Sequence, residues 1–320
     1  MTERATPLAA GVAADLGDRV VASLASAVHA PTETLRLPLL CLLAEGHVLV
    51  EDVPGVGKTV LAKALARSLH LSFARVQFTP DLLPSDVTGV NVFDQSTSSF
   101  RFRPGPVFAN VLLVDEVNRA SPKTQSALLE AMQETQVTVD GATHPVQRPF
   151  LVLATQNPVE YEGTYPLPEA QLDRFAVRMA IGYPPLAEEA RMLAEQTTEP
   201  PLEHLQPVAA REEVLAAIDA ARSVYVEESV NRYVVALLRH TRGNERLVLG
   251  ASPRAGIALL RLAKARALVE RREFVTPEDV GAMAPHVLPH RLLLAPEARS
   301  AGLTAEEAVA AALESTPVPL

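Results

Sequence analysis

Two spacings of apolar residues divide the chain into two parts. In the first part, short apolar runs alternate with segments in which apolar residues recur at every third or fourth position. The runs are typical of buried strands, and the second spacing is typical of helices with one buried face. This alternation predicts an α/β domain built on a parallel sheet. The predicted strands are the run that begins at Val48, then Ala74–Phe78, Val111–Val114, Phe150–Thr155 and Phe175–Ile181.

Two further segments alternate apolar with polar residues, as exposed hairpins do. The first pairs Val90–Phe93 with Phe100–Arg103 across the polar residues 94–99. The second pairs Gln136–Val139 with Thr143–Val146 across an Asp-Gly dipeptide, which is favoured in tight turns. Both are long for simple connections, so we expect them to face a partner surface or the pore of an assembly.

Helical signals occupy the rest of the chain. Apolar residues recur at every fourth position from Val12 to Val28, a second helix is expected at about Leu35–Glu45, and Ser121 with Pro122 begins another. The composition changes at 182–185, which predicts a core domain over residues 1–184 and an all-α domain over 185–320. The helices predicted there are Leu186–Thr197, Ala209–Ser223, Glu228–Gly243, Ser252–Glu270, Pro277–Ala284 and Thr304–Leu313.

The composition excludes several classes of protein. The chain has 320 residues, a net charge of −9 and only 4% aromatic residues, which argues against a basic nucleic-acid surface spread over the whole molecule. The single cysteine, Cys41, lies in an apolar run and is expected to be a buried structural thiol. No apolar run approaches the roughly 18 residues of a membrane span, and the amino-terminal segment does not resemble a signal peptide. We expect a cytoplasmic protein.

A Gly-rich loop between the first predicted strand and a helix has the composition of a phosphate-binding loop. Glycines let backbone N–H groups turn toward phosphate oxygens, and the start of the helix adds its positive dipole end. Lys58 is expected to neutralise the β- and γ-phosphates of ATP, and the hydroxyl of Thr59 to ligate Mg²⁺. Asp52 stands where such loops usually have their first glycine. The expected nucleotide-binding residues are Pro54, Gly55, Val56, Gly57, Lys58, Thr59 and Val60.

Polar residues at the ends of the next strands complete a candidate hydrolytic site. Asp115 and Glu116 follow a buried strand, where an Asp can hold Mg²⁺ and a Glu can polarise the attacking water. Asn157 follows the neighbouring strand and could orient that water. Arg174, at the rim of the α/β domain, and Arg254, at the start of a helix in the second domain, could stabilise charge on a phosphoryl group. Each of these residues alone is also consistent with an ordinary turn or a solvated surface.

Five runs of residues occur in order within about Leu35–Arg272: Glu51–Thr59, Val114–Ala120, Lys123–Glu134, Ala154–Pro158 and Leu167–Phe175. Together, and in this order, they resemble the MoxR family of AAA+ ATPases. The resemblance implies an αβα core and a smaller all-α lid, with a Walker A loop at Gly55–Thr59. It also implies a Walker B pair at Asp115 and Glu116, sensor 1 at Asn157, an arginine finger at Arg174 that acts on the neighbouring subunit, and sensor 2 at Arg254. Asp52 in place of glycine is a familiar variant in this family.

The resemblance also implies a function. We expect Mg²⁺-dependent hydrolysis of ATP by a ring, expected to be a hexamer, that acts as a chaperone-like motor on a protein client. The client or partner would carry a von Willebrand factor A domain, and the work would be maturation of another enzyme or insertion of its metal. Three alternatives remain: a DNA-translocating helicase subunit, the ATPase subunit of a metal chelatase, and a phosphate-loop kinase. A kinase gives no role to Glu116, Asn157 and the two arginines, and stimulation by DNA or by a protein would separate the others.

Overall fold

A five-stranded parallel sheet forms the centre of the computed structural model, which describes residues 7–157, 163–184, 186, 188–190 and 201–319. The strand order is β2-β5-β8-β1-β9, and each neighbouring pair is parallel. All five predicted strands are present, and their carboxyl ends therefore meet at one edge. Their bounds are β1 Val48–Glu51, β2 Phe73–Gln77, β5 Val111–Asp115, β8 Leu151–Gln156 and β9 Val177–Met179.

Successive residues of the central strands enter two different cores, which explains why these strands are continuously apolar. Val111 and Leu113 of β5 pack with the helices α1–α3. Leu112 and Val114 pack with α5 on the opposite face. The bounds of these helices are α1 Pro7–Ala25, α2 Thr32–Leu43, α3 Lys58–Ser68, α4 Pro84–Thr88, α5 Pro122–Glu134 and α6 Glu169–Leu172. As predicted, Ser121 caps α5, because its hydroxyl accepts the backbone N–H of Thr124.

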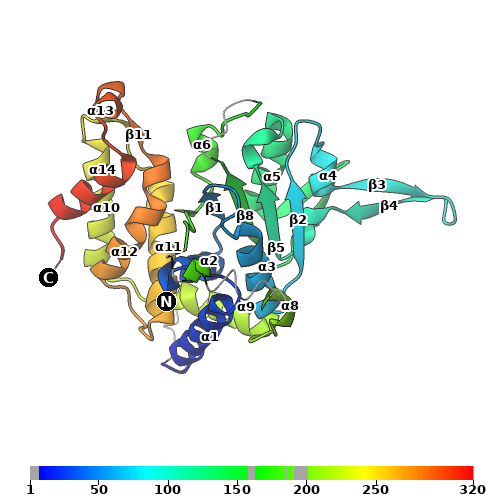
Figure 1. The fold of residues 1–320 in the computed structure, drawn as a ribbon, viewed down its shortest axis with the longest axis horizontal. Coiled ribbons are helices and arrows are strands. Elements are labelled where there is room, and N and C mark those ends of the chain that lie inside the picture. Colours follow the sequence, from blue (N-terminus) through cyan, green and yellow to red (C-terminus); the bar gives the residue numbers. More distant parts are fainter. Residues whose placement is uncertain (1–6, 158–162, 185, 187, 191–200, 320) are drawn as a thin grey trace.

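Both predicted hairpins are confirmed. The first consists of β3 (Gly89–Asp94) and β4 (Ser99–Pro104), and it projects far from the sheet (Figure 1). The second consists of β6 (Gln136–Val139) and β7 (Ala142–Pro145). Side chains join the two hairpins: Asn91 of β3 donates to Asp140 at 2.8 Å, and Phe102 of β4 stacks on His144 of β7. Beyond that junction Phe93 and Phe100 remain 50% and 73% exposed.

The carboxyl-terminal part is mostly helical, as predicted, and lies at the other end of the molecule from the β3–β4 hairpin (Figure 1). A short antiparallel pair was not predicted: β10 (Leu247–Leu249) with β11 (Leu293–Leu294). The helix expected at 186–197 lies largely outside the described residues, and the boundary at residue 184 stays a prediction. The helices are α8 Pro201–His204, α9 Arg211–Ser223, α10 Glu228–Arg242, α11 Pro253–Val269, α12 Pro277–Val287, α13 Pro296–Ser300 and α14 Ala305–Ser315.

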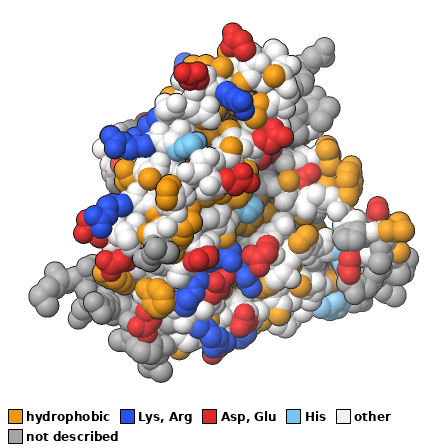
Figure 2. All heavy atoms as spheres, turned by 90° about the vertical axis from the view of Figure 1, so that its left-hand side faces the viewer, with side chains coloured by type: hydrophobic (Ala, Val, Ile, Leu, Met, Phe, Trp, Pro, Cys, Tyr) orange, Lys and Arg blue, Asp and Glu red, His pale blue; other side chains and the backbone are white. Residues whose placement is uncertain are grey.

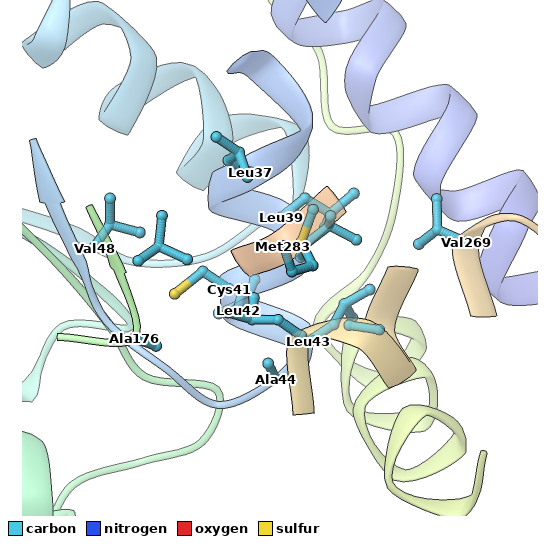
Figure 3. Packing of buried hydrophobic residues seen from close by; sticks show 14 of the residues in the cluster. Leu37, Leu39, Cys41, Leu42, Leu43, Ala44, Val48, Ala176, Val269 and Met283 are labelled. Atoms are coloured by element: carbon cyan, nitrogen blue, oxygen red, sulfur yellow. The ribbon is translucent and has the colours of Figure 1, made fainter. Parts of the chain in front are cut away.

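Helix α2 lies between the sheet and the carboxyl-terminal helices (Figure 3). Cys41 is beside Val48 and Ala176 on the strand side, whereas Leu39 is beside Met283 of α12. The Cys41 side chain is free and fully buried, as predicted, and burial raises the pKa of its thiol. Since both sides of α2 are covered, the sheet and the last helices share one apolar core.

The surface of the carboxyl-terminal helices carries acidic, basic and apolar side chains side by side, and neither charge gathers into a single area on the face in view (Figure 2). None of the helices in the described ranges has the length and the apolar character that crossing a membrane requires.

Candidate active site

The phosphate-binding loop connects β1 to α3 at the carboxyl edge of the sheet. Gly55 and Gly57 have φ angles of +89° and +92°, which side chains disfavour, so glycine is required at both positions. Nothing lies within 4 Å of where a Cβ of either glycine would stand, and no side chain caps α3. The loop therefore presents a helix start and open backbone, to which an anionic group such as a phosphate fits. Thr59 lies in the first turn of that helix.

Lys58 and three acids share this edge of the sheet. The amino group of Lys58 donates to the main-chain carbonyl of Asp52. Burial lowers the pKa of Lys58, and the negative charges of Asp52, Asp115 and Glu116 oppose that shift. Because only β8 separates β1 from β5 in the parallel sheet, the phosphate loop after β1 and the acidic pair at the end of β5 lie at the same edge.

Asp115 is held firmly at the end of β5. One of its carboxylate oxygens accepts a hydrogen bond from Nε of Arg75 at 2.6 Å. The other oxygen accepts the hydroxyl of Thr155, on the neighbouring strand β8, at 3.4 Å. The residue is 8% exposed. The carboxylate of Asp115 and the hydroxyl of Thr59 are hard oxygen ligands of the kind that Mg²⁺ prefers. These two residues therefore fit the Mg²⁺ that the resemblance implies.

Glu116 has a left-handed backbone, with φ of +55°. A non-glycine residue keeps such a conformation only where its surroundings impose it. Its N–H donates to Thr155 Oγ1 at 3.0 Å, and its carboxylate accepts Gln77 Nε2 at 2.7 Å and Arg119 Nη1 at 3.0 Å. Gln77 and Arg119 were not singled out from the sequence. The signal for Gln77 was its position at the end of β2, beside β5.

Asn157 directly follows β8, which lies between β5 and β1 in the sheet. Its chain position is therefore between the strand that carries Asp115 and the strand that leads into the phosphate loop. The structure thus brings Asn157 to the edge where the sequence predicted it.

The two predicted arginines lie at the opposite edge of the sheet. Arg174 precedes β9, and it lines a hollow of about 340 Å³ together with Gly46 and His47, which precede β1. Arg254 lines the same hollow. Helix α11 begins beside the segment that carries Arg174, because the hydroxyl of Ser252 bonds Asp173. The sequence placed Arg254 only at the start of a helix, so its position beside Arg174 was not predicted.

This hollow is rich in positive charge. Arg254 and Arg261 project from one face of α11, and no acidic partner is recorded for either within the described ranges. The Nε of Arg174 is buried without a hydrogen-bond partner in the described part of the chain. Arg222 and Arg291 also line the hollow but are paired with Glu45 and Asp173. The arrangement can receive an anion that its own chain does not supply.

Asp52 has a role that the sequence did not reveal. One carboxylate oxygen accepts the N–H of Val53 at 2.8 Å. The other accepts the N–H groups of Ile181 and Gly182, at 2.7 and 2.8 Å. The side chain therefore ties the first residues of the phosphate loop to the segment that leaves β9. A glycine at this position could not make these three bonds.

Comparison with known proteins agrees with this geometry. Residues 47–177 match the model of the ATPase family associated with various cellular activities (AAA), and residues 239–312 match the AAA lid domain. A candidate ATPase from Cytophaga hutchinsonii, known from its crystal structure, is similar with a TM-score of 0.91. It is 37% identical to this chain, and the match covers 98% of this chain and 97% of that one.

Two relatives match most of the chain. The uncharacterised protein YeaC of Bacillus subtilis is 51% identical over 284 residues, which cover 89% of each chain. Chaperone MoxR1 of Mycobacterium tuberculosis is 39% identical over 97% of this chain and 85% of its own. The two family models match in order along the chain, and the helical lid follows the parallel-sheet domain in sequence. The chain therefore belongs to the MoxR family of AAA+ ATPases.

Proposed function

We propose that this chain hydrolyses ATP in a ring whose active sites form between neighbouring subunits. The observation that carries the proposal is the position of Arg174 and Arg254, which share a hollow at the edge of the sheet opposite their own phosphate loop. An arginine in this hollow lies far from its own phosphate loop, so it could act on a phosphoryl group only if the nucleotide were bound to a neighbouring subunit. The buried Nε of Arg174, which has no partner among the described residues, supports this use.

Each residue then has a chemical task. Lys58 and the backbone of Gly55 and Gly57 hold the phosphates. Mg²⁺, held by Thr59 and Asp115, would neutralise charge on the β- and γ-phosphate oxygens. Glu116 accepts a proton from the attacking water, and the Asn157 amide orients that water.

Glu116 holds donors on one side of its carboxylate. Gln77 and Arg119 both donate to the same oxygen, Oε2, and these two bonds orient the carboxylate. The attacking water would bind the other oxygen, Oε1, or displace one of the two donors.

The arginines supply the largest single contribution. An arginine finger accelerates phosphoryl transfer by about 10³- to 10⁵-fold. A single subunit should therefore be almost inactive, and specific activity should rise with protein concentration. The competing role of Arg174 is an ordinary surface ion pair with a neighbouring acid, which would contribute less than about 1 kcal/mol to stability.

We further propose a hexameric ring that acts on a protein client, with a von Willebrand factor A-domain protein as its partner, in maturation or metal insertion of another enzyme. The name of the chaperone relative supports a protein client over the chelatase and helicase alternatives. The exposed Phe93 and Phe100 on the β3–β4 hairpin offer an apolar contact for such a client. A cytoplasmic location stays a prediction.

Mixing two inactive variants tests the shared site. Arg174→Ala and Glu116→Gln subunits should each be inactive alone. In mixed rings, some interfaces combine an intact Glu116 with an intact Arg174 from the neighbour, so activity should return. Arg232→Ala, which removes a 73% exposed arginine from α10, should retain activity and serves as the matched control. If mixed rings form, as shown by co-purification of two tags, and remain inactive, Arg174 does not act on the neighbouring subunit.

A further inference from the structure

An ion pair between a buried arginine and a partly buried aspartate joins the lid to the segment that carries Arg174. Arg291, just after α12, has a side chain only 2% exposed. Its Nε donates to a carboxylate oxygen of Asp173 at 2.7 Å, and its Nη2 donates to the main-chain carbonyls of Asp173 and Phe175 at 3.2 and 2.7 Å. Arg291 therefore fixes both the side chain and the backbone of this segment.

The same carboxylate also holds the start of α11. The hydroxyl of Ser252 lies 3.2 Å from one oxygen of Asp173 and 3.3 Å from the other. Ser252 is the N-cap of α11 and accepts the N–H of Ala255. Arg254 lies in the first turn of that helix. Asp173 directly precedes Arg174, and its side chain bonds the side chain of Ser252, two residues before Arg254.

Stability alone is a poor explanation for this arrangement. Burying a charged pair costs desolvation energy that the attraction between the charges only partly offsets, and apolar residues of similar size are often as stable in such a place. A planar guanidinium with several fixed N–H groups instead defines geometry, because each donor has one direction. The two segments that Arg291 and Asp173 hold belong to the core and to the lid.

We propose that Arg291, Asp173 and Ser252 form a positioning unit that sets the distance between Arg174 and Arg254, so that both reach one nucleotide on the neighbouring subunit. This inference rests on the proposed function of the two arginines. The three residues do not touch the nucleotide themselves. They act by holding the two guanidinium groups in register, and a displacement of about 1 Å at a reacting centre can lower a rate about 10²-fold.

Asp173→Asn is the first test, because it keeps the shape of the side chain and removes its charge. In the assembled ring, kcat for ATP should fall about 10- to 100-fold, whereas KM should stay within about twofold because the phosphate loop of each subunit is intact. Glu306→Gln is the matched control. It removes another acid of a lid–core ion pair, with Arg178; neither residue of that pair lines the hollow, and kcat should not change. A kcat for Asp173→Asn within twofold of wild type would overturn the proposal, as would an equal loss in the control.

Mixing separates this inference from the function on which it rests. Asp173→Asn subunits keep a sound Glu116, so rings mixed with Glu116→Gln subunits should regain activity. If Arg174→Ala with Glu116→Gln regains activity but Asp173→Asn with Glu116→Gln does not, the positioning role is wrong and the shared site stands. If neither mixture regains activity, the shared site itself is wrong.

Arg291→Lys covers the case in which Asp173→Asn fails to fold. It keeps a positive charge opposite Asp173 but cannot bond the carboxylate and the carbonyls together. We expect a folded ring with kcat lowered about tenfold and an unchanged KM. Full activity in a folded Arg291→Lys ring would show that charge alone suffices and would overturn the positioning role.

Discussion

Replacing Asp52 by glycine, the residue usual at this point of a phosphate loop, should destabilise this protein. The change removes the acceptor of the Val53, Ile181 and Gly182 N–H groups, at 2.7–2.8 Å. Asp52 is 8% exposed and Ile181 is 6% exposed, so water can replace the lost partners only in part. Each buried donor left without a partner costs about 1–3 kcal/mol. With two of the three left unpaired, we expect a loss of about 3 kcal/mol in the free energy of unfolding.

Asp52→Asn should give a smaller loss. The asparagine oxygen can accept two of the three N–H groups, but its amide nitrogen then faces the remaining donor. One bond and the charge are lost, which corresponds to about 1–2 kcal/mol. Urea unfolding at neutral pH measures both variants. Asp219→Asn, at an exposed acid with surface arginine partners, is the control and should change stability by less than about 1 kcal/mol. The free energy of unfolding should decrease from wild type to the asparagine variant and again to the glycine variant. A glycine variant whose free energy of unfolding lies within about 0.5 kcal/mol of wild type would refute the reasoning.

Three further predictions concern catalysis, partner binding and pH. Glu116→Gln should bind ATP as wild type does and lose turnover; single-turnover hydrolysis within a fewfold of wild type would remove Glu116 from its role as base. Shortening residues 94–99 should spare basal ATPase and abolish stimulation by a partner, which a stimulated ATPase assay measures. Burial lowers the pKa of His47 from 6.5 to about 4. Between these two pH values the unfolded state binds more protons than the folded state does. The free energy of unfolding should therefore fall by about 3 kcal/mol as the pH drops from 6.5 to 4. Urea unfolding of His47→Gln should lack this fall.

Local signals were enough to predict most of the elements. Ser121-Pro122 specifies a helix start because the hydroxyl caps N–H groups only three residues away. The Asp140-Gly141 turn specifies its hairpin in the same way. The phosphate loop and the acidic pair could also be placed in advance, since parallel strands bring their carboxyl ends to one edge regardless of the details of packing.

Contacts between distant parts of the chain could not be predicted. Arg291 and Asp173 are 118 positions apart, and Asp52 and Ile181 are 129 apart. Neither pair has a periodicity or a spacing that marks it in one sequence. The place of Arg254 depends on such a contact, because Ser252 meets Asp173 only after the lid has packed on the core. From the sequence, Arg254 could be placed only at the start of its helix, without that packing.

The position of α2 between the sheet and the last helices bears on how a ring of these subunits could move. Separating the two parts would expose the apolar cluster that runs from Val48 to Met283, at about 25 cal/mol for each Å² of apolar surface. In the proposed ring, by contrast, the hollow around Arg174 and Arg254 would separate from a neighbouring subunit with its charged groups hydrated. We therefore expect each subunit to turn as a rigid body, with the joints of the ring lying between subunits. In calorimetry the whole chain should melt in a single transition, with no separate event for the lid.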